Sequence, residues 1–343
     1  MAVTFLLKTP ASPLSNKTGL KKLKVSDIAY STGMFGKNTV HVLRPKIDKI
    51  SITYDIQNAQ DQEGVNNLLA QAVIDGTCPE YESATYSKGK AWGYKTSVHL
   101  KHPDTNERIL IQATPNKKQN RFMRFEFNPT KLGKAGMQFF REELDGLFGG
   151  HYSYSNVITE GHITRVDIAS DFVGITMNDI LVRSVKPGIT MAFLGKAGVL
   201  ESVYPSKPPK GEKSPNKVYD KKQEQWGKAN TLEFGGISHL RAEISVETDL
   251  RVPDLHKLKN HFTKLDIIAR AAITPPEEEH HWRFFFDSCR VRGVKGALDQ
   301  LPDHLKEPYA TALRDAGKAF WRPEKIWSYW PKEFKKSNLL DGL

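Results

Sequence analysis

The stretch HITRVDIASDF, residues 162–172, alternates in the manner of a β-strand. In an extended strand Arg165, Asp167 and Asp171 share one face, and the alternate residues form a second, mainly apolar face. The apolar face predicts a strand that covers a hydrophobic core. The two carboxylates on the other face are costly to bury unless cations accompany them.

A second stretch, SHLRAEISVE at residues 238–247, repeats this arrangement, with Arg241, Glu243 and Ser245 on one face. If the two strands are neighbours, Asp167 and Glu243 converge. Carboxylate oxygens are the ligands that Mg²⁺ and Mn²⁺ favour, so the strands form a candidate metal site. Cross-strand bridges between arginines and carboxylates, or an edge strand with a solvated face, would explain the same pattern without a metal.

The rest of the chain supplies further strands and helices. Alternating stretches predict strands at 49–55, 91–101, 108–113, 121–127, 190–204 and 217–222. Helical spacing predicts helices at 62–75, 130–147, 177–185, 254–272, 277–289, 293–300 and 304–317. The sequence therefore predicts an α+β fold: a mixed, mostly antiparallel sheet core with packed helices, followed by a helical C-terminal region.

The charge of the chain indicates an acidic partner. Its 343 residues include 50 Lys or Arg and 39 Asp or Glu, which gives a net charge of +11. Nucleic acid is the most common acidic partner, although a solvated basic surface gives the same charge. Lysines concentrate in a Pro-rich loop at 205–216 and in an aromatic tail at 318–336. The tail aromatics either stack on bases or pack onto the core.

Missing motifs exclude several classes of protein. No apolar run is long enough for a membrane span, and we expect residues 1–10 to be ordinary chain rather than a signal peptide. Cys78 and Cys289 cannot form a disulfide framework or a cysteine-rich zinc module, and they suit a reducing cytoplasm. The chain has no Walker motif, dinucleotide-binding glycine motif, nucleophile elbow, H-E-x-x-H or paired-histidine metal motif.

The segment NKVYDKKQE, residues 216–224, places Tyr219 among lysines. Tyr219 shares a face with Lys221 if the strand continues, whereas it aligns with Lys222 if a helix begins here. A phenol has a reference pKa near 10 and needs help to act as a nucleophile. A nearby ammonium favours the phenolate, and a metal withdraws charge from a phosphate under attack. The segment suits tyrosyl phosphoryl transfer on DNA, although a structural tyrosine fits the same residues.

Together the three segments resemble the replication initiation factor family, which comprises rolling-circle replication initiators of plasmids and filamentous phages. The chain matches the family's R-x-D-x-x-x-D strand at 165–171, its Y-[DN]-K-x-x-E segment at 219–224 and its R-x-E strand at 241–243. The stretch RFEFNPTKL at 124–132 is similar to the F-N-P-x-K-L element of the phage members. The resemblance covers about residues 120–250.

The resemblance implies a DNA nickase and strand transferase that initiates rolling-circle replication. Tyr219 would attack a phosphodiester at the replication origin, retain the 5′ phosphate covalently and release a 3′ hydroxyl as primer. Lys221 would stabilise the phosphate or the phenolate. Tyr152 and Tyr154 are rival nucleophiles that lack flanking lysines.

The resemblance also implies a divalent cation, Mg²⁺ or Mn²⁺, held by carboxylates. By position the ligands are Asp167 and Glu243, with Asp171 as a third candidate and Glu224 as a residue that positions a water or the metal. The residues assigned to DNA or phosphate are Arg165, Arg241, Lys217, Lys222, Lys213 and Lys210. The implied partners are origin DNA, single-stranded or supercoiled, and a host helicase and polymerase in the bacterial cytoplasm, and we also consider a homodimer.

We expect the chain to have three parts. Residues 1–120 form an N-terminal α+β part, residues 121–252 the catalytic nicking core, and residues 253–343 a helical, basic and aromatic region that contacts DNA or a partner. The alternative is a non-catalytic basic DNA-binding protein, such as a phage or plasmid regulator. The carboxylates favour the enzyme, because acids that face phosphate repel it. An RNA-binding protein is a weaker alternative, since no ribonucleoprotein motif is present.

Overall fold

The computed structural model describes residues 23–35, 38–74, 80–83, 93–149, 152–185, 190–195, 198–205, 216–229 and 232–343. The strands of the main sheet are β1 (Ile28–Phe35), β2 (Asn38–Leu43), β3 (Lys46–Tyr54), β4 (Tyr81–Ser83), β5 (Tyr94–Lys101), β6 (Arg108–Pro115), β7 (Met123–Phe127), β8 (His162–Val173), β10 (Met191–Leu194), β11 (Leu200–Tyr204), β12 (Asn216–Asp220) and β13 (His239–Glu247). A second sheet pairs β9 (Ile180–Ser184) with β14 (Leu265–Ala269).

The 12-stranded main sheet has the order β10-β11-β12-β13-β8-β3-β7-β6-β5-β4, and β2 joins β1 to β8. Every strand pair among the described residues is antiparallel. The helices are α2 (Ala59–Ile74), α3 (Pro129–Phe148), α4 (Tyr154–Glu160), α5 (Lys221–Ala229), α6 (Glu279–Leu298), α7 (Asp303–Phe320), α8 (Pro323–Trp327) and α9 (Trp330–Lys335). The predicted α+β class, with a helical C-terminal region, is confirmed.

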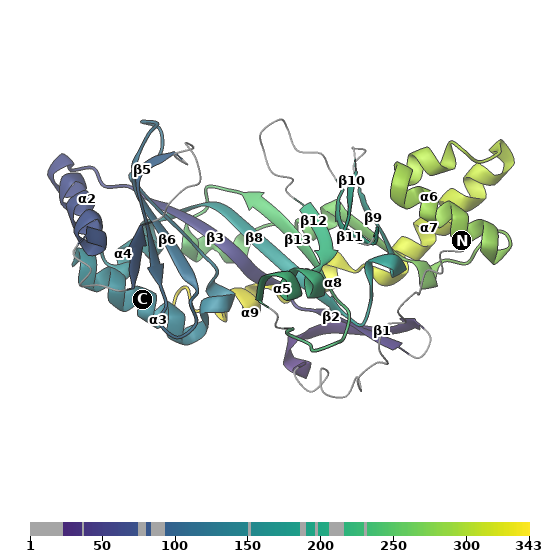
Figure 1. Cartoon of the computed structure of the whole chain (residues 1–343), viewed down its shortest axis with the longest axis horizontal. Coiled ribbons are helices and arrows are strands. Elements are labelled where there is room, and N and C mark those ends of the chain that lie inside the picture. The colour runs from purple at the N-terminus through teal and green to yellow at the C-terminus, as the bar shows by residue number, and fades with distance from the viewer. Residues whose placement is uncertain are drawn as a thin grey trace, which may run out of the picture.

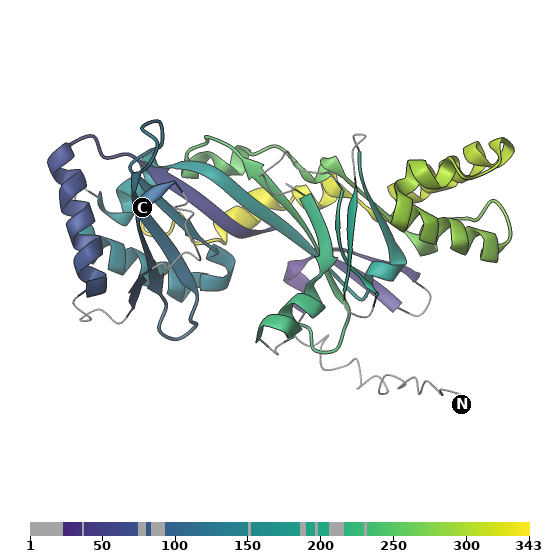
Figure 2. The same ribbon diagram turned by 45° about the horizontal axis from the view of Figure 1, so that its top comes forward.

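The sheet is long and twisted, with helices at both ends (Figure 1). Helices α2 and α3 lie at the end formed by β4 to β7, and α6 and α7 form a separate lobe at the end formed by β10 and β11. The helices α8 and α9 run along the sheet between these two ends (Figure 2). Within the described residues, no helix is long and apolar enough to cross a membrane.

The start of α3 explains the F-N-P element locally. The side chain of Asn128 accepts a hydrogen bond from the backbone of Lys131, and Pro129 occupies the first helical turn, where its missing N–H costs nothing. Gly149 ends the helix with a positive φ of 64°, which favours glycine. This element therefore positions a helix against β3 and does not itself contribute to the site described below.

The apolar face of the sheet forms the main core. Val166, Ile168 and Phe172 of β8 are buried there, as their alternation predicts. The tail aromatics pack onto this face: Phe172 lies 5.9 Å from Phe320 and 5.6 Å from Trp321, measured between ring centroids. Of the two roles open to the tail aromatics, these two rings fill the structural one.

Two predicted helices are wrong. Residues 177–185 begin with a short 3₁₀ turn and continue as β9, and residues 254–272 contain short 3₁₀ turns around β14. β9 and β14 pair along their whole lengths, with Ile267 opposite Val182. Buried β-branched side chains at these positions suit a strand, but their spacing also fits a helix, and only the partner strand distinguishes the two.

The predicted strand at 217–222 is two residues too long. The strand β12 ends at Asp220, whose side chain accepts a hydrogen bond from the backbone of Gln223 at 2.9 Å and so begins α5. Lys221 therefore lies in the first turn of a helix rather than on a strand.

Candidate functional site

The charged face of the sheet brings the predicted residues together. β12 pairs with β13, and β13 pairs with β8, so the two carboxylate strands are neighbours as expected. Arg241 lies opposite both Tyr219 and Asp171. Glu243 lies opposite Lys217, and Asp167 lies opposite the next β13 residue on this face, Ser245. The resulting row of polar side chains crosses three strands.

Tyr219 lies at the centre of this row. Only 8% of its surface is exposed, and its hydroxyl donates to Oε2 of Glu243 at 3.1 Å. The ammonium of Lys217 binds Oε1 of the same carboxylate at 2.8 Å. The Nζ atoms of Lys217 and Lys221 lie 5.1 and 5.6 Å from the centre of the Tyr219 ring. Lys221 also forms an ion pair with Glu224, so Glu224 is connected to Tyr219 through Lys221.

Burial controls the protonation of the Tyr219–Glu243 pair. Burial, and then the negative charge of Glu243, raise the pKa of Tyr219 well above its ordinary value. Burial also raises the pKa of Glu243, although Lys217 acts in the opposite direction. The resting site therefore holds a neutral phenol that donates to a carboxylate with increased affinity for a proton.

An open pocket of about 350 Å³ lies beside Tyr219. Its lining comes from β11, β12 and the first turn of α5, and comprises Glu201, Ser202, Tyr204, Lys217, Tyr219, Asp220, Gln223 and Glu224. A pocket of this size accommodates a small ligand or part of a larger one. The nearly buried phenol therefore still borders solvent-accessible space.

Asp171 is the most strongly paired acid of the face. Arg241 binds both of its oxygens, at 2.6 and 3.0 Å, and Lys46 binds Oδ2 at 2.7 Å. Arg241 also binds Asp48 at 2.6 Å. Burial raises the pKa of Asp171, but Arg241 and Lys46 outweigh it and hold that pKa well below its usual range. Arg241 thus forms the cross-strand bridge to a carboxylate that the sequence left open as an explanation without a metal.

Asp171 also belongs to a group that could hold a metal ion. One ligand atom each from Asp171, His239 and Glu233 lies within 4.8 Å of the others. His239 is 1% exposed; its Nε2 lies 3.4 Å from Oδ1 of Asp171, and its Nδ1 has no hydrogen-bond partner among the described residues. A buried imidazole beside a carboxylate, with one nitrogen unpaired, fits a metal ligand, because an unpaired buried polar group is otherwise costly. The Nζ of Lys46 lies 2.7 Å from Asp171 and 3.9 Å from Glu233, so an ammonium occupies the cation position.

The sequence interpretation included only one member of this group. His239 stands two residues before Arg241 and shares its face, so strand alternation could have identified it. Glu233 precedes the strand in a turn, and no sequence signal places it there. Asp167 and Glu243, the first-choice ligands, share the face but lie outside this group of ligand atoms. Glu243 binds Tyr219 and Lys217 instead.

The remaining predicted residues have defined partners or lie outside the described residues. Arg165 binds both oxygens of Asp167, at 2.8 and 2.9 Å, and reaches Ser245 at 3.2 Å. Lys222 donates to the backbone oxygen of Gly236 at 2.8 Å. The other two residues assigned to DNA lie outside the described residues: Lys210 and Lys213.

The rival tyrosines have structural roles. The Tyr154 hydroxyl is buried and donates to the backbone oxygen of Leu339 at 2.8 Å. The Tyr152 hydroxyl donates to Asp61 at 2.7 Å, and burial, followed by Asp61, raises the pKa of Tyr152 to about 12. Unlike Tyr219, neither lines the pocket beside β12.

No family model matches the chain, and no curated protein matches it. The family resemblance therefore stays a prediction that depends on the three motifs and on the geometry they adopt.

Proposed function

We propose that this protein initiates rolling-circle replication by nicking one DNA strand at a specific site and rejoining it through a 5′-phosphotyrosine on Tyr219. The observation that supports this most is the contact between the Tyr219 hydroxyl and Glu243, beside two ammonium groups and an open pocket. A nucleophile within hydrogen-bond reach of a base is the arrangement that covalent catalysis needs. The net charge of +11 suits a DNA substrate.

The chemistry follows from these contacts. Glu243 takes the phenolic proton as the Tyr219 oxygen forms a bond to phosphorus, and the bond from phosphorus to the 3′ oxygen breaks. The 3′ oxygen leaves and takes a proton from solvent, which yields the primer end. Lys217 and Lys221 offset the charge that develops on the phosphate oxygens. The reverse sequence rejoins the strand, and it needs no nucleotide because the phosphotyrosine keeps the bond energy.

The proposed cation is Mg²⁺ or Mn²⁺, held by Asp171, His239 and Glu233. When bound, a divalent cation would supply Lewis-acid neutralisation of phosphate charge. An imidazole among the ligands favours Mn²⁺ over Mg²⁺, which prefers oxygen ligands only. Lys46 has to leave the carboxylates to admit the ion, and its side chain is 24% exposed and can turn towards solvent. Asp171 would also have to share with the ion one of the oxygens that Arg241 binds.

The proposed partners follow from the same reading. The sequence contains no Walker motif, so unwinding and synthesis fall to a helicase and a polymerase of the host. Those partners place the protein in the bacterial cytoplasm.

The test uses a supercoiled plasmid that carries the coding sequence and its flanks. The full chain is incubated with it and Mn²⁺, and the denatured products are examined for nicked DNA with bound protein. We expect an adduct for the wild type and for Tyr152→Phe, and none for Tyr219→Phe. An adduct that survives Tyr219→Phe would contradict the assignment. Tight, salt-sensitive binding without nicking would support the non-catalytic regulator instead.

A further inference from the structure

The face that carries Tyr219 continues onto the edge of the sheet as an aromatic surface. Ser202 of β11 lies opposite Tyr219, and Phe193 of β10 lies opposite Ser202, so the three residues share this face. Tyr204 is two residues beyond Ser202 and therefore projects to the same side. The rings of Phe193 and Tyr204 meet edge to face, with centroids 5.2 Å apart. We call Phe193 and Tyr204 the edge aromatics.

Tyr204 borders the pocket, and Phe193 contacts the Tyr204 ring on the side away from β12 and remains open to solvent. Tyr204 is part of the pocket lining, and Phe193 is 51% exposed. The exposed half of this phenylalanine contributes nothing to the fold, because that apolar surface stays in water. Exposed aromatic rings on a sheet face are surfaces on which unpaired bases stack.

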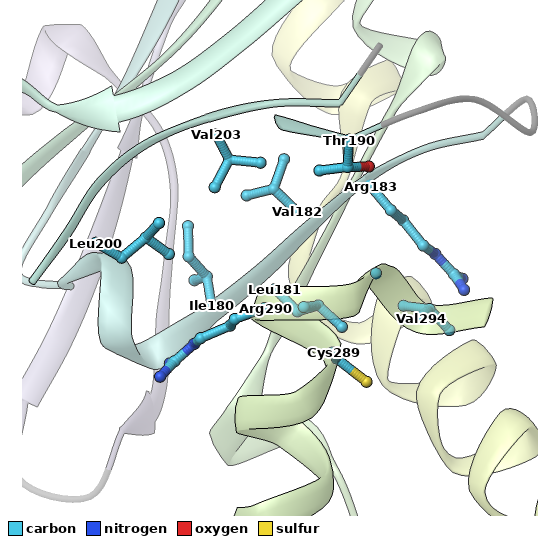
Figure 3. A pocket seen from close by; sticks show the side chains of 11 residues that line it. Ile180, Leu181, Val182, Arg183, Thr190, Leu200, Val203, Cys289, Arg290 and Val294 are labelled. Atoms are coloured by element: carbon cyan, nitrogen blue, oxygen red, sulfur yellow. The ribbon is translucent and has the colours of Figure 1, made fainter. Parts of the chain in front are cut away.

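Apolar side chains on the opposite face of the sheet support the strands that carry the edge aromatics. Val203 projects to the opposite face, where it and Leu200 lie near Ile180 and Val182 of β9 (Figure 3). The cavity between these side chains measures about 20 Å³, enough for about one water molecule, so it is a packing gap rather than a ligand site. The aromatic surface is therefore supported by packed side chains, and an incoming base need not order it first.

The charges of the pocket indicate which part of a nucleotide it accepts. Among the described residues that line it, Glu201, Asp220 and Glu224 are acidic, and Lys217 is the only cation. Lys217 is already bound to Glu243. Glu224 is likewise paired with Lys221, whereas Glu201 and Asp220 repel a phosphate but can accept hydrogen bonds from the amino groups of a base. The Glu201 and Asp220 side of the pocket thus suits a base, and the phosphate would lie on the side that Tyr219 and Lys217 line.

We infer that one unpaired base of single-stranded DNA enters this pocket, with its face on Phe193 and its edge against Tyr204, next to the phosphate that Tyr219 attacks. The inference rests on the proposed function, because it takes DNA as the substrate. It adds that the substrate is single-stranded at this point, since the edges and faces of a paired base are not free to enter a pocket.

The test compares two ligands of equal charge: a short deoxyadenosine homopolymer and an abasic strand of the same length. Binding of the full chain is measured without added metal, for the wild type, Phe193→Ala, Phe193→Trp and Phe284→Ala. Phe284 is a matched control, because it is 74% exposed but lies on α6 in the distant lobe.

We expect the wild type to prefer the homopolymer over the abasic strand. Phe193→Ala should lower this preference by about 5- to 150-fold, the loss expected for one stacked base. Phe193→Trp should retain the preference, and Phe284→Ala should leave it unchanged. An unchanged preference in Phe193→Ala, or an equal loss in Phe284→Ala, would overturn the inference.

The outcomes separate this inference from the proposed function. A Phe193-dependent preference in a protein that forms no DNA adduct would refute the nickase and leave the base pocket standing. An adduct on Tyr219 together with no Phe193 effect would do the reverse.

Discussion

Two glutamates on one face of the sheet, the half-buried Glu126 and the buried Glu243, have opposite electrostatic environments. Glu126 of β7 binds Lys49 at 3.1 Å and also pairs with Arg124, whereas Glu243 of β13 pairs with a single cation of the described residues, Lys217. For Glu126, burial raises the pKa, but Arg124 and Lys49 outweigh it and lower that pKa overall. For Glu243, burial dominates and the pKa is raised. We call the part of the sheet around Glu126 the first half and the part around Glu243 the second half. The glutamate of the first half is held as a carboxylate, whereas the glutamate of the second half has a raised affinity for a proton.

The side chains that surround the two glutamates differ in the same way. Around Glu126, Arg124 donates to Ser51 and to Gln112, each at 2.7 Å, and Gln112 donates to Ser97 at 2.9 Å. This network satisfies its members and holds β3, β7, β6 and β5 in register. Near Glu243 lie Tyr219, whose hydroxyl donates to it, and His239, whose Nδ1 has no hydrogen-bond partner among the described residues. We infer that the first half is structural and that the second keeps titratable groups with raised pKa values for chemistry.

The largest change in the free energy of unfolding should come from replacing the arginine of each half, Arg241 or Arg124. Arg241→Met leaves Asp171, which has no exposed side-chain surface, without its bidentate partner. We expect the free energy of unfolding to fall by about 3–5 kcal/mol. Each acid retains one lysine, Lys46 or Lys49, but Arg124→Met should cost less, about 1–2 kcal/mol, because Glu126 is partly exposed and water can solvate it. Urea denaturation of both variants measures the difference, and equal losses would contradict the contrast.

The next effect concerns the two glutamates. The lowered pKa of Glu126 means that its carboxylate stabilises the fold above its unfolded pKa, and that this contribution is lost as the pH falls through the folded pKa. The raised pKa of Glu243 means that its favourable contribution is present below the unfolded pKa and is lost as the pH rises through the folded pKa. At neutral pH, Glu126→Gln should therefore destabilise the fold by about 1–3 kcal/mol, and Glu243→Gln should leave stability unchanged or raise it by up to about 1 kcal/mol.

Urea denaturation at neutral pH and near pH 4 measures the free energy of unfolding of each glutamine variant relative to wild type. Both differences in this free energy should shrink at the lower pH, because each wild-type carboxylate gains a proton. A destabilised Glu243→Gln variant at neutral pH would show that this carboxylate is as well paired as Glu126.

The smallest expected effect is on metal affinity. Removal of a ligand by His239→Ala should weaken Mn²⁺ binding by at least about tenfold, which is about 1.4 kcal/mol. His99→Ala is the control from the other half, because Nδ1 of His99 is also buried without a hydrogen-bond partner among the described residues. Calorimetric titration of the full chain measures both. Equal weakening by both variants, or none by His239→Ala, would contradict the site.

Much of the fold and part of the candidate site could be predicted from the sequence, because the alternation of side chains along a strand is a local pattern. The faces of β8 and β13, and the antiparallel core, follow from residues such as Asp167 and Glu243. Contacts that depend on distant segments could not be read in the same way. Glu233 reaches the site from a turn, and the β9–β14 pair joins segments about 80 residues apart, so neither has a local signal. Likewise, only the packing of Phe320 reveals that part of the tail supports the core.

Identification of the residue that carries DNA would decide whether Tyr219 is the nucleophile. The denatured adduct is digested with nuclease and protease, and the peptide that retains a nucleotide is sequenced by mass spectrometry. We predict a single modified peptide with the phosphodiester on Tyr219. A nucleotide on Tyr152, Tyr154 or Tyr204 instead would contradict the account.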